Sequence, residues 1–231
     1  LPIWEFIVMD IARILFPSPL LVLPVPHLRF IKVDLAQIVQ QAGDCNAFER
    51  RHGEFFIEFC LLVTQVFQPV PHIQAVLQQA ALLCKDAQSA LFVGRGMGAA
   101  ISYEGALKLK EVSYLHAEAY AAGEMKHGPI ALIDPGFPVI AVATKSATYD
   151  KTVSNLMECK ARGAKVIVVA TEGDEEINKI ADCIIRVPAV RDVFSPITAS
   201  VPLQLLAREV AILRGCDVDQ PRNLAKSVTV E

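Results

Sequence analysis

The chain has 231 residues, of which 53% are hydrophobic and 20% charged, and its formal net charge is -3. This length is sufficient for a full hydrophobic core, either as one large α/β unit or as one domain with an additional segment. The weakly acidic balance excludes a broad basic surface for nucleic acid. The six cysteines are scattered without a C-x-x-C pair or metal-ligand spacing, so we expect reduced, buried thiols and no metal site.

The first 70 residues do not follow a continuous helical or strand period. Leu1 to Pro26 is apolar, but Glu5, Asp10 and Arg13 interrupt it and several prolines would break a spanning helix. A basic n-region and a small-residue cleavage site are absent from this stretch, so it does not resemble a signal peptide. We therefore expect a cytoplasmic protein without a membrane partner, and we treat residues 1–70 as an N-terminal segment of unclear origin.

From Pro71 onward, helical and strand patterns alternate. Gly94, Gly163 and Gly215 lie where elements are expected to end, and Ser195-Pro196 is typical of an N-cap followed by proline at the first helical position. The predicted helices cover 72–84, 99–116, 147–161, 174–180 and 195–213, and the predicted strands cover 90–93, 138–143, 165–170 and 183–187.

The strand at 165–170, KVIVVA, is entirely apolar after its first residue, as expected of a strand buried on both faces of a sheet. Strands that alternate with helices at this spacing predict a parallel sheet with helices on both faces. We therefore expect one α/β domain over residues 71–231, in which residues 216–231 form a C-terminal tail without a clear period.

Gly94 to Ala99 follows a predicted strand and opens a predicted helix, so it matches a loose G-x-G-x-x-A pattern for pyrophosphate. A dinucleotide fold would also place a carboxylate at the end of the second strand, which here ends in Ala143-Thr144-Lys145. We therefore interpret the glycines as a tight strand-to-helix turn rather than a cofactor site.

Glu104, Lys108 and Glu111 stand at positions i, i+4 and i+7, and therefore project from one face of the predicted helix. One interpretation is a surface ion pair between Glu104 and Lys108, which would stabilise the helix by only about 0.2–0.5 kcal/mol. The other is a carboxylate base beside a cation, an arrangement suited to removing a proton next to a carbonyl. Spacing alone favours the ion pair.

Three further residues have both a structural and a functional interpretation. A lone histidine such as His116 or His127 is more often structural than catalytic, but His127 precedes Gly128-Pro129, a backbone break that can present a side chain to a cleft. Lys226, near the C-terminus, would ordinarily be solvated.

Four stretches of the sequence resemble one known family, glutamine–fructose-6-phosphate aminotransferase (isomerizing), over its C-terminal part. The stretches read GRG, EGALKLKEVSYLHAEAYAAGEMKHGPIALI, VPLQLLA and DVDQPRNLAKSVTVE. The match as a whole covers roughly residues 71–231 and ends where that family ends. The resemblance implies a sugar-isomerase (SIS) domain, a flavodoxin-like α/β sandwich of three layers that binds phosphosugars. It implies an aminotransferase that converts fructose 6-phosphate and ammonia from glutamine to glucosamine 6-phosphate, for UDP-N-acetylglucosamine synthesis.

The same resemblance assigns roles to single residues. Glu111 would be the base that moves a proton between C1 and C2 of the sugar, and Lys226 the lysine that forms a Schiff base with its carbonyl. His127 would help to open the sugar ring, and in the family it comes from the neighbouring subunit of a dimer. Lys108 and Ala225 would contact the substrate, and no metal or organic cofactor is required.

The chain also departs from the family's pattern. The glutaminase domain is absent, as is the first SIS domain with its Ser/Thr-rich phosphate loop, so we expect a fragment whose missing portions would be partners. Thr144, Ser146 and Thr148 occupy the matching loop of the domain present, although helix capping explains them equally well. A non-catalytic phosphosugar-binding SIS module is therefore the alternative function.

Overall fold

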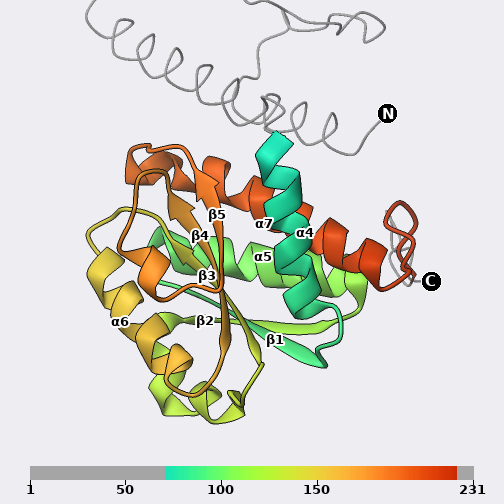
Figure 1. Ribbon diagram of the computed structural model, residues 1–231, viewed down its shortest axis with the longest axis horizontal. Helices are drawn as coiled ribbons and strands as arrows, with labels where there is room; N and C mark the ends of the chain where they lie inside the picture. Colours follow the sequence, from blue (N-terminus) through green and yellow to red (C-terminus); the bar gives the residue numbers. More distant parts are fainter. Residues whose placement is uncertain (1–70, 223–231) are drawn as a thin grey trace, which may run out of the picture. The chain divides into compact units, whose positions relative to one another are not determined.

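The computed structural model describes residues 71–222, and residues 1–70 and 223–231 lie outside the described part of the chain (Figure 1). At the centre is a five-stranded parallel sheet with the strand order β2-β1-β3-β4-β5. Because β1 lies between β2 and β3, the chain extends the sheet first to one side and then to the other. The strands are β1 Ser89–Gly94, β2 His116–Ala121, β3 Pro138–Ala143, β4 Lys165–Thr171 and β5 Cys183–Val187.

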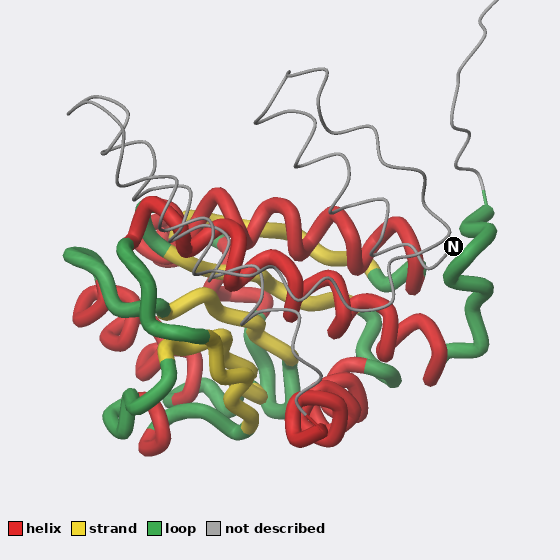
Figure 2. The backbone as a smooth tube through the Cα atoms, turned by 90° about the horizontal axis from the view of Figure 1, so that it is seen from above, coloured by secondary structure: helices red, strands yellow, loops and turns green. Residues whose placement is uncertain are grey.

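Helices cover both faces of the sheet, which confirms the predicted three-layer α/β sandwich (Figures 1 and 2). One face carries three helices and the other carries α6. The α-helices are α4 Pro71–Cys84, α5 Met97–Ser113, α6 Tyr149–Lys160 and α7 Ser195–Leu213, and the short 3-10 helices are η2 Ala122–His127, η3 Pro129–Leu132, η4 Ile177–Lys179 and η5 Asp192–Phe194.

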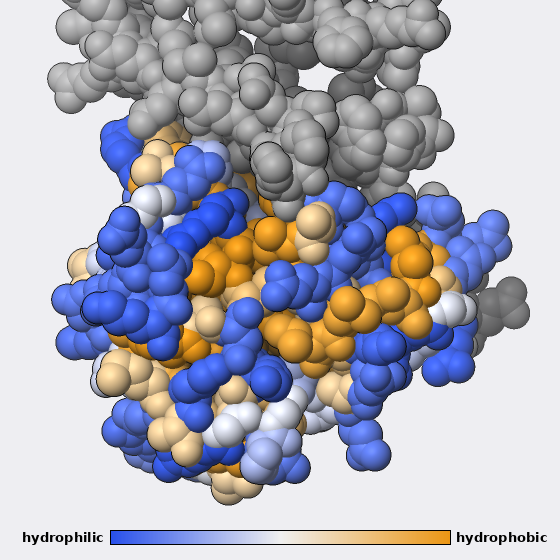
Figure 3. Space-filling view, viewed as in Figure 1, coloured by the Kyte–Doolittle hydropathy of each residue, from blue (hydrophilic) through white to orange (hydrophobic). Residues whose placement is uncertain are grey.

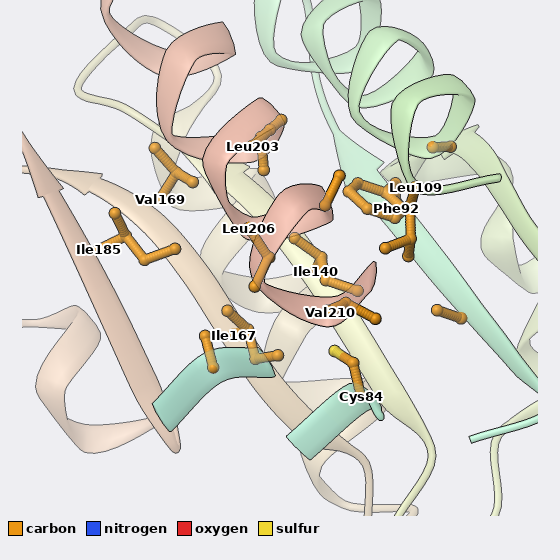
Figure 4. Close-up of a cluster of buried hydrophobic side chains, with 14 of the residues drawn as sticks. Cys84, Phe92, Leu109, Ile140, Ile167, Val169, Ile185, Leu203, Leu206 and Val210 are labelled. Carbon is orange, nitrogen blue, oxygen red and sulfur yellow. The ribbon is translucent and has the colours of Figure 1, made fainter. Parts of the chain in front are cut away.

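The hydrophobic core consists of two clusters, one on each side of the sheet. Phe92, Ile140 and Leu203 belong to the cluster beneath α4, α5 and α7, which Figure 4 shows in close-up. Val139 and Leu156 belong to the cluster beneath α6. Neighbouring residues of β3 enter opposite clusters because strand side chains alternate between faces, which is why this strand is apolar throughout.

The sequence-based prediction missed β2. It continued the long helix to His116, whereas α5 ends at Ser113 and Tyr114 adopts a left-handed φ of 58°. The next six residues, HAEAYA, pair with β1 from Ser89↔His116 to Gly94↔Ala121. Alanine and glutamate favour helices, so only tertiary pairing makes this edge segment a strand.

Two smaller predictions were wrong in detail. The acidic helix expected over 174–180 is reduced to η4, and the buried Asp174 instead accepts a hydrogen bond from the hydroxyl of Tyr149. Ser195 is the first residue of α7 and does not act as its N-cap, since its hydroxyl donates to the Asp192 carbonyl at 2.7 Å. The other predicted elements agree with the structure to within a few residues.

Helix α7 is apolar because it packs inside the domain. Among the described residues, Asp192–Leu213 is the one helical stretch long and apolar enough to cross a membrane. Half of its most apolar 18-residue segment is buried in the structure. It contacts α5 along its length and also packs against α4. Some apolar surface remains on the face that carries α4 and α7, where Leu82, Ile212 and Leu213 are exposed (Figure 3).

Candidate active site

The outer face of α5 carries a compact cluster of three charged side chains. The Nζ atom of Lys108 lies 2.8 Å from Oε2 of Glu111 and 4.0 Å from Oε1 of Glu104. All three side chains are half-buried, with exposed fractions of 34% for Lys108, 26% for Glu111 and 35% for Glu104. The stronger contact is therefore with Glu111, whereas spacing had favoured Glu104.

A residue that sequence reasoning did not single out completes this cluster. Gln204, on α7, donates a hydrogen bond from Nε2 to Oε1 of Glu104 at 3.2 Å. Gly105 permits this approach of the two helices, because a Cβ there would lie 2.7 Å from Cδ1 of Leu203 and 2.8 Å from the ring of Phe92. Gln204 belongs to the VPLQLLA motif, but a local pattern cannot indicate a partner 100 residues away.

The buried side of α5 explains where the cluster lies. Residues at helical spacing point toward the sheet, among them Ile101, Gly105 and Leu109. Because this face is held by the core, the charged residues lie on the flank of the helix beside α7, where Gln204 bonds to Glu104 and the three side chains stay half-buried. A carboxylate beside an ammonium group on a packed helix can accept a proton from carbon while the cation stabilises the developing negative charge.

His127 and Glu111 lie at opposite ends of strand β2. Glu111 is near the end of α5, which precedes β2, while His127 ends η2, which follows β2. A six-residue strand spans roughly 17–20 Å, so the two side chains of one chain are not brought together. The His127 side chain is 75% exposed and lies 3.9 Å from Glu124. His116 begins β2, is also exposed, and lies 3.6 Å from Glu118.

The glycines after β1 form a tight turn, as interpreted from the sequence. A Cβ at Gly94 would lie 2.3 Å from the Gly98 carbonyl oxygen, and one at Gly98 would lie 2.9 Å from the Val142 carbonyl oxygen. Gly96 has a φ of 54°, which favours glycine. Packing within the turn, a positive φ and packing against β3 therefore account for Gly94, Gly96 and Gly98 respectively.

The loop after β3 lies beside this turn, at the carboxyl edge of the sheet. The hydroxyl oxygens of Ser146 and Thr148 are 3.3 Å apart, and Ser146 Oγ also accepts from the Thr148 N–H. Thr148 is the N-cap residue of α6 but makes no side-chain capping bond. The hydroxyls therefore bond to one another and to the loop backbone.

Lys145, in the same loop, belongs to a network with Tyr149 and Asp174. Its Nζ atom lies 3.3 Å from Oδ1 of Asp174 and 3.5 Å from the centre of the Tyr149 ring. Burial would raise the pKa of Asp174, but the hydrogen bond from Tyr149 and the contacts with Lys145 outweigh burial and lower it. The network joins the loops after β3 and β4.

Two predicted site residues, Ala225 and Lys226, lie outside the described residues. The described chain ends at Arg222, whose backbone N–H donates to the hydroxyl of Tyr114 at 2.7 Å. Between residues 71 and 222, no group of three or more His, Cys, Asp or Glu side chains could hold a metal ion.

Curated relatives share much of this sequence. The chain is 53% identical over 207 residues to glutamine–fructose-6-phosphate aminotransferase [isomerizing] of Thermus thermophilus, in a match that takes in 87% of this chain and 34% of that protein. The corresponding protein of Methanosarcina mazei is 50% identical over 175 residues, covering 73% of this chain and 28% of its own length. The chain thus spans about a third of the length of these relatives.

The first of these matches is longer than the resemblance recognised from the motifs. Residues 71–231 make up 161 of the 231 residues, or about 70%, whereas the match takes in 87%. Part of the N-terminal segment therefore also aligns with that relative.

Solved structures and a family model agree with the fold. The C-terminal domain of glucosamine-fructose-6-phosphate aminotransferase from Francisella tularensis superposes with a TM-score of 0.66 at 37% identity, over 75% of this chain and 48% of that chain. Glucosamine-6-phosphate deaminase from Thermotoga maritima superposes with a TM-score of 0.53 at 28% identity, over 69% and 47% of the two chains. The SIS domain model matches residues 83–214, which include the sheet and the charged cluster on α5. The chain therefore belongs to the SIS domain family.

Proposed function

We propose that this chain is the isomerase portion of a glutamine–fructose-6-phosphate aminotransferase, acting on fructose 6-phosphate to form glucosamine 6-phosphate. The observation that carries the proposal is the contact of 2.8 Å between Glu111 and Lys108, inside the motif that resembles this family. Relatives that are 50–53% identical to this chain over the aligned residues bear that name. The product would enter amino-sugar and UDP-N-acetylglucosamine synthesis in the cytoplasm.

In this proposal, Glu111 moves the proton between C1 and C2 of the open-chain sugar. The amine of Lys226 adds to the C2 carbonyl and water leaves, so that an imine withdraws electrons from the adjacent C–H bond. Glu111 then takes the proton from C1, the electron pair of that C–H bond moves toward the imine nitrogen, and the positive charge of Lys108 stabilises the electron-rich intermediate. Gln204 holds Glu104 beside Lys108 and thereby limits the positions that the ammonium group can adopt.

His127 would act from the neighbouring subunit of a homodimer. The separation of Glu111 and His127 along β2 supports this arrangement, because one chain cannot direct both side chains at the same sugar ring. His127 is exposed and directly precedes Gly128, so it can reach a neighbouring molecule.

The remaining parts of the reaction would come from outside this chain. The relatives are about three times as long, and we propose that the portions missing here supply ammonia from glutamine and hold the sugar phosphate. The hydroxyls of Ser146 and Thr148 bond within their own loop, which supports a phosphate site elsewhere.

The test is to incubate the chain with fructose 6-phosphate and follow glucose 6-phosphate formation. Glu111→Gln keeps the size of the side chain and removes the base, so we expect isomerisation to fall by at least about 100-fold while sugar binding remains. Tyr103→Phe, an exposed position on the same helix, is the matched control and should retain full activity. Binding without isomerisation by the unmodified chain would instead favour the alternative, a phosphosugar-binding module.

A further inference from the structure

The 3-10 helix η2 packs against α6 and ends at His127, and Figure 1 shows it in yellow-green beside α6. The two residues before His127 both contact α6. The Sδ atom of Met125 lies 4.0 Å from the Sγ atom of Cys159. The Nζ atom of Lys126 lies 3.0 Å from Oε1 of Glu158. Met125 is buried and Lys126 is exposed, so η2 has one side in the core and one at the surface.

A third contact comes from Arg95, in the turn between β1 and α5. Its Nε atom donates to Oδ1 of Asn155 on α6 at 3.1 Å, and Asn155 is buried. Its guanidinium lies against Gly123 of η2, where a Cβ atom would be 2.8 Å from Nη2 and 3.2 Å from Cζ. Arg95 therefore lies between α6 and η2 and contacts both.

Space explains the glycine at position 123, and backbone conformation does not. Gly123 is not among the glycines that have a positive φ. The three atoms nearest to a Cβ built there all belong to the guanidinium of Arg95. Because this group is the end of a flexible side chain, a methyl group at position 123 would displace it without disrupting the fold.

The shape of Arg95 matters more here than its charge. Between residues 71 and 222 no carboxylate pairs with it, and its hydrogen-bond acceptor is the neutral amide of Asn155. A guanidinium is planar and presents its donors in a fixed fork, whereas a lysine ammonium is a compact charge on a flexible stem. A lysine at position 95 would therefore keep the charge but would not fill the space between the two elements.

The position of the His127 side chain depends on the backbone of η2. This side chain is 75% exposed, and the acidic group beside it, Glu124 at 3.9 Å, belongs to the same short helix. A 3-10 helix of six residues has poor hydrogen-bond geometry of its own, so its contacts with α6 and Arg95 hold it in place. The placement of His127 is therefore set by how η2 is held on α6.

We propose that Arg95 is a positioning residue, whose guanidinium fixes η2 on α6 and thereby sets the position from which His127 reaches the neighbouring subunit. The inference rests on the proposed function for the role of His127 in opening the sugar ring. Arg95 does not touch the sugar in this arrangement and acts through the backbone of residues 122–127. A shift of about 1 Å in a catalytic group can lower a rate by about 100-fold.

The fixing of η2 is tested first without substrate, by amide hydrogen exchange of residues 122–128 in the full chain. Arg95→Lys removes the planar group, and Gly123→Ala displaces it. We expect these amides to exchange at least about fivefold faster in both variants, because local opening of η2 becomes easier.

Arg186→Lys is the matched control for Arg95→Lys. Arg186 also bonds to an asparagine side chain, that of Asn178, but it lies on β5, at the opposite edge of the sheet from β2. Its substitution should leave exchange in residues 122–128 unchanged. An equal increase in Arg186→Lys, or no increase in Arg95→Lys and Gly123→Ala, would overturn the inference.

The link to His127 is tested with a pair of sugars. Fructose 6-phosphate closes into a five-membered ring through its C5 hydroxyl, whereas 5-deoxyfructose 6-phosphate has no such hydroxyl and stays open. A residue that positions His127 for ring opening matters for the first sugar and not for the second. We expect Arg95→Lys to lower kcat by at least about tenfold for fructose 6-phosphate and by less than about twofold for the 5-deoxy sugar.

His127→Ala is the reference for this pattern and should show it with a larger loss on fructose 6-phosphate. Arg186→Lys should leave the isomerisation of both sugars unchanged. An equal loss on both sugars in Arg95→Lys, in kcat or as a rise in KM, would overturn the inference, because a direct contact between Arg95 and the sugar phosphate would give that result.

The two measurements separate failure of this inference from failure of the proposed function. If exchange in residues 122–128 responds to Arg95→Lys but the unmodified chain isomerises neither sugar, Arg95 fixes η2 and the proposed function fails for this chain. If the unmodified chain isomerises both sugars and His127→Ala slows both equally, the proposed isomerase stands and the inference is overturned.

Discussion

Lys108 lies between two carboxylates about two turns apart on α5, and only one of them is close enough for a strong hydrogen bond. The distance of 2.8 Å to Glu111, against 4.0 Å to Glu104, places the cation on the residue proposed as the base. Glu104 instead has Gln204 as its hydrogen-bond donor. At the level of residues, the cluster therefore depends on how closely α7 approaches α5.

That approach depends on Gly105. Gly105→Ala would gain about 1 kcal/mol of helix propensity but would place a methyl group within 3.0 Å of Leu203 and Phe92. Overpacking of this kind costs about 1–3 kcal/mol, and the ring of Phe92 is buried and cannot move freely. The approaches of 2.7 and 2.8 Å are to a buried side chain and a buried ring, so we expect a cost in the upper part of this range, about 2–3 kcal/mol. After the gain in helix propensity, the free energy of unfolding, measured in urea, should fall by about 1–2 kcal/mol.

The matched control for Gly105→Ala is a double variant. Leu203→Ala removes the clashing Cδ1 atom, so the loss in Gly105→Ala/Leu203→Ala should be smaller than the sum of the two single losses. Additive losses, or a single variant as stable as the unmodified chain, would contradict the packing argument.

At the scale of elements, the edge strand β2 shows a limit of prediction from local sequence pattern. Its residues favour a helix, and the helix before it ends only because Tyr114 leaves the helical region. By contrast, β3 and β4 were predicted nearly to their ends, because their apolar residues are buried between two layers. β5 is also an edge strand, but its residues are mostly β-branched and alternate between buried and partly buried positions, so it was predicted as well. Prediction of an edge strand therefore depends on residues that favour strands, and these are scarce in β2.

The loops after β3 and β4 are joined through Asp174, and this joint should depend on pH. The pKa of the Asp174 carboxyl group is lower in the folded chain than the value of about 3.9 in an unfolded chain. The carboxylate therefore stabilises the fold fully above that unfolded value, and the contribution is lost as the pH falls through the lower folded value. We expect Asp174→Asn to lower the free energy of unfolding by roughly 1.5–3 kcal/mol at pH 7. In this variant, the free energy of unfolding should also decrease less steeply as the pH falls.

Urea unfolding at a series of pH values measures this effect. Asp134→Asn is the control, because Asp134 is exposed, and it should leave the curve unchanged. If the free energy of unfolding falls as steeply at acidic pH in Asp174→Asn as in the unmodified chain, other groups govern the pH dependence.

At the scale of the whole molecule, the role proposed for His127 requires a second chain. If His127 serves the site of its neighbour, mixing Glu111→Gln chains with His127→Ala chains creates dimers with one intact site. Random pairing makes half of the dimers mixed, so about a quarter of the original isomerase activity should return. Each variant alone should be nearly inactive, and mixtures that stay inactive would place both residues in one subunit's site or rule out exchange of subunits.

The sequence by itself determined the α/β class, the bounds of α7 and of three strands, and the outward face of α5, because each follows from the periodicity of neighbouring residues. Its motifs also indicated the family and the residues Glu111, His127 and Lys226. Only the tertiary structure decided that 116–121 is a strand, that Gln204 reaches Glu104, that Arg222 binds Tyr114, and that Glu111 and His127 lie at opposite ends of β2. Each of these features depends on residues that are separated in the chain. A local sequence pattern indicates which side chains of a segment are buried, but it does not indicate which distant segment they contact.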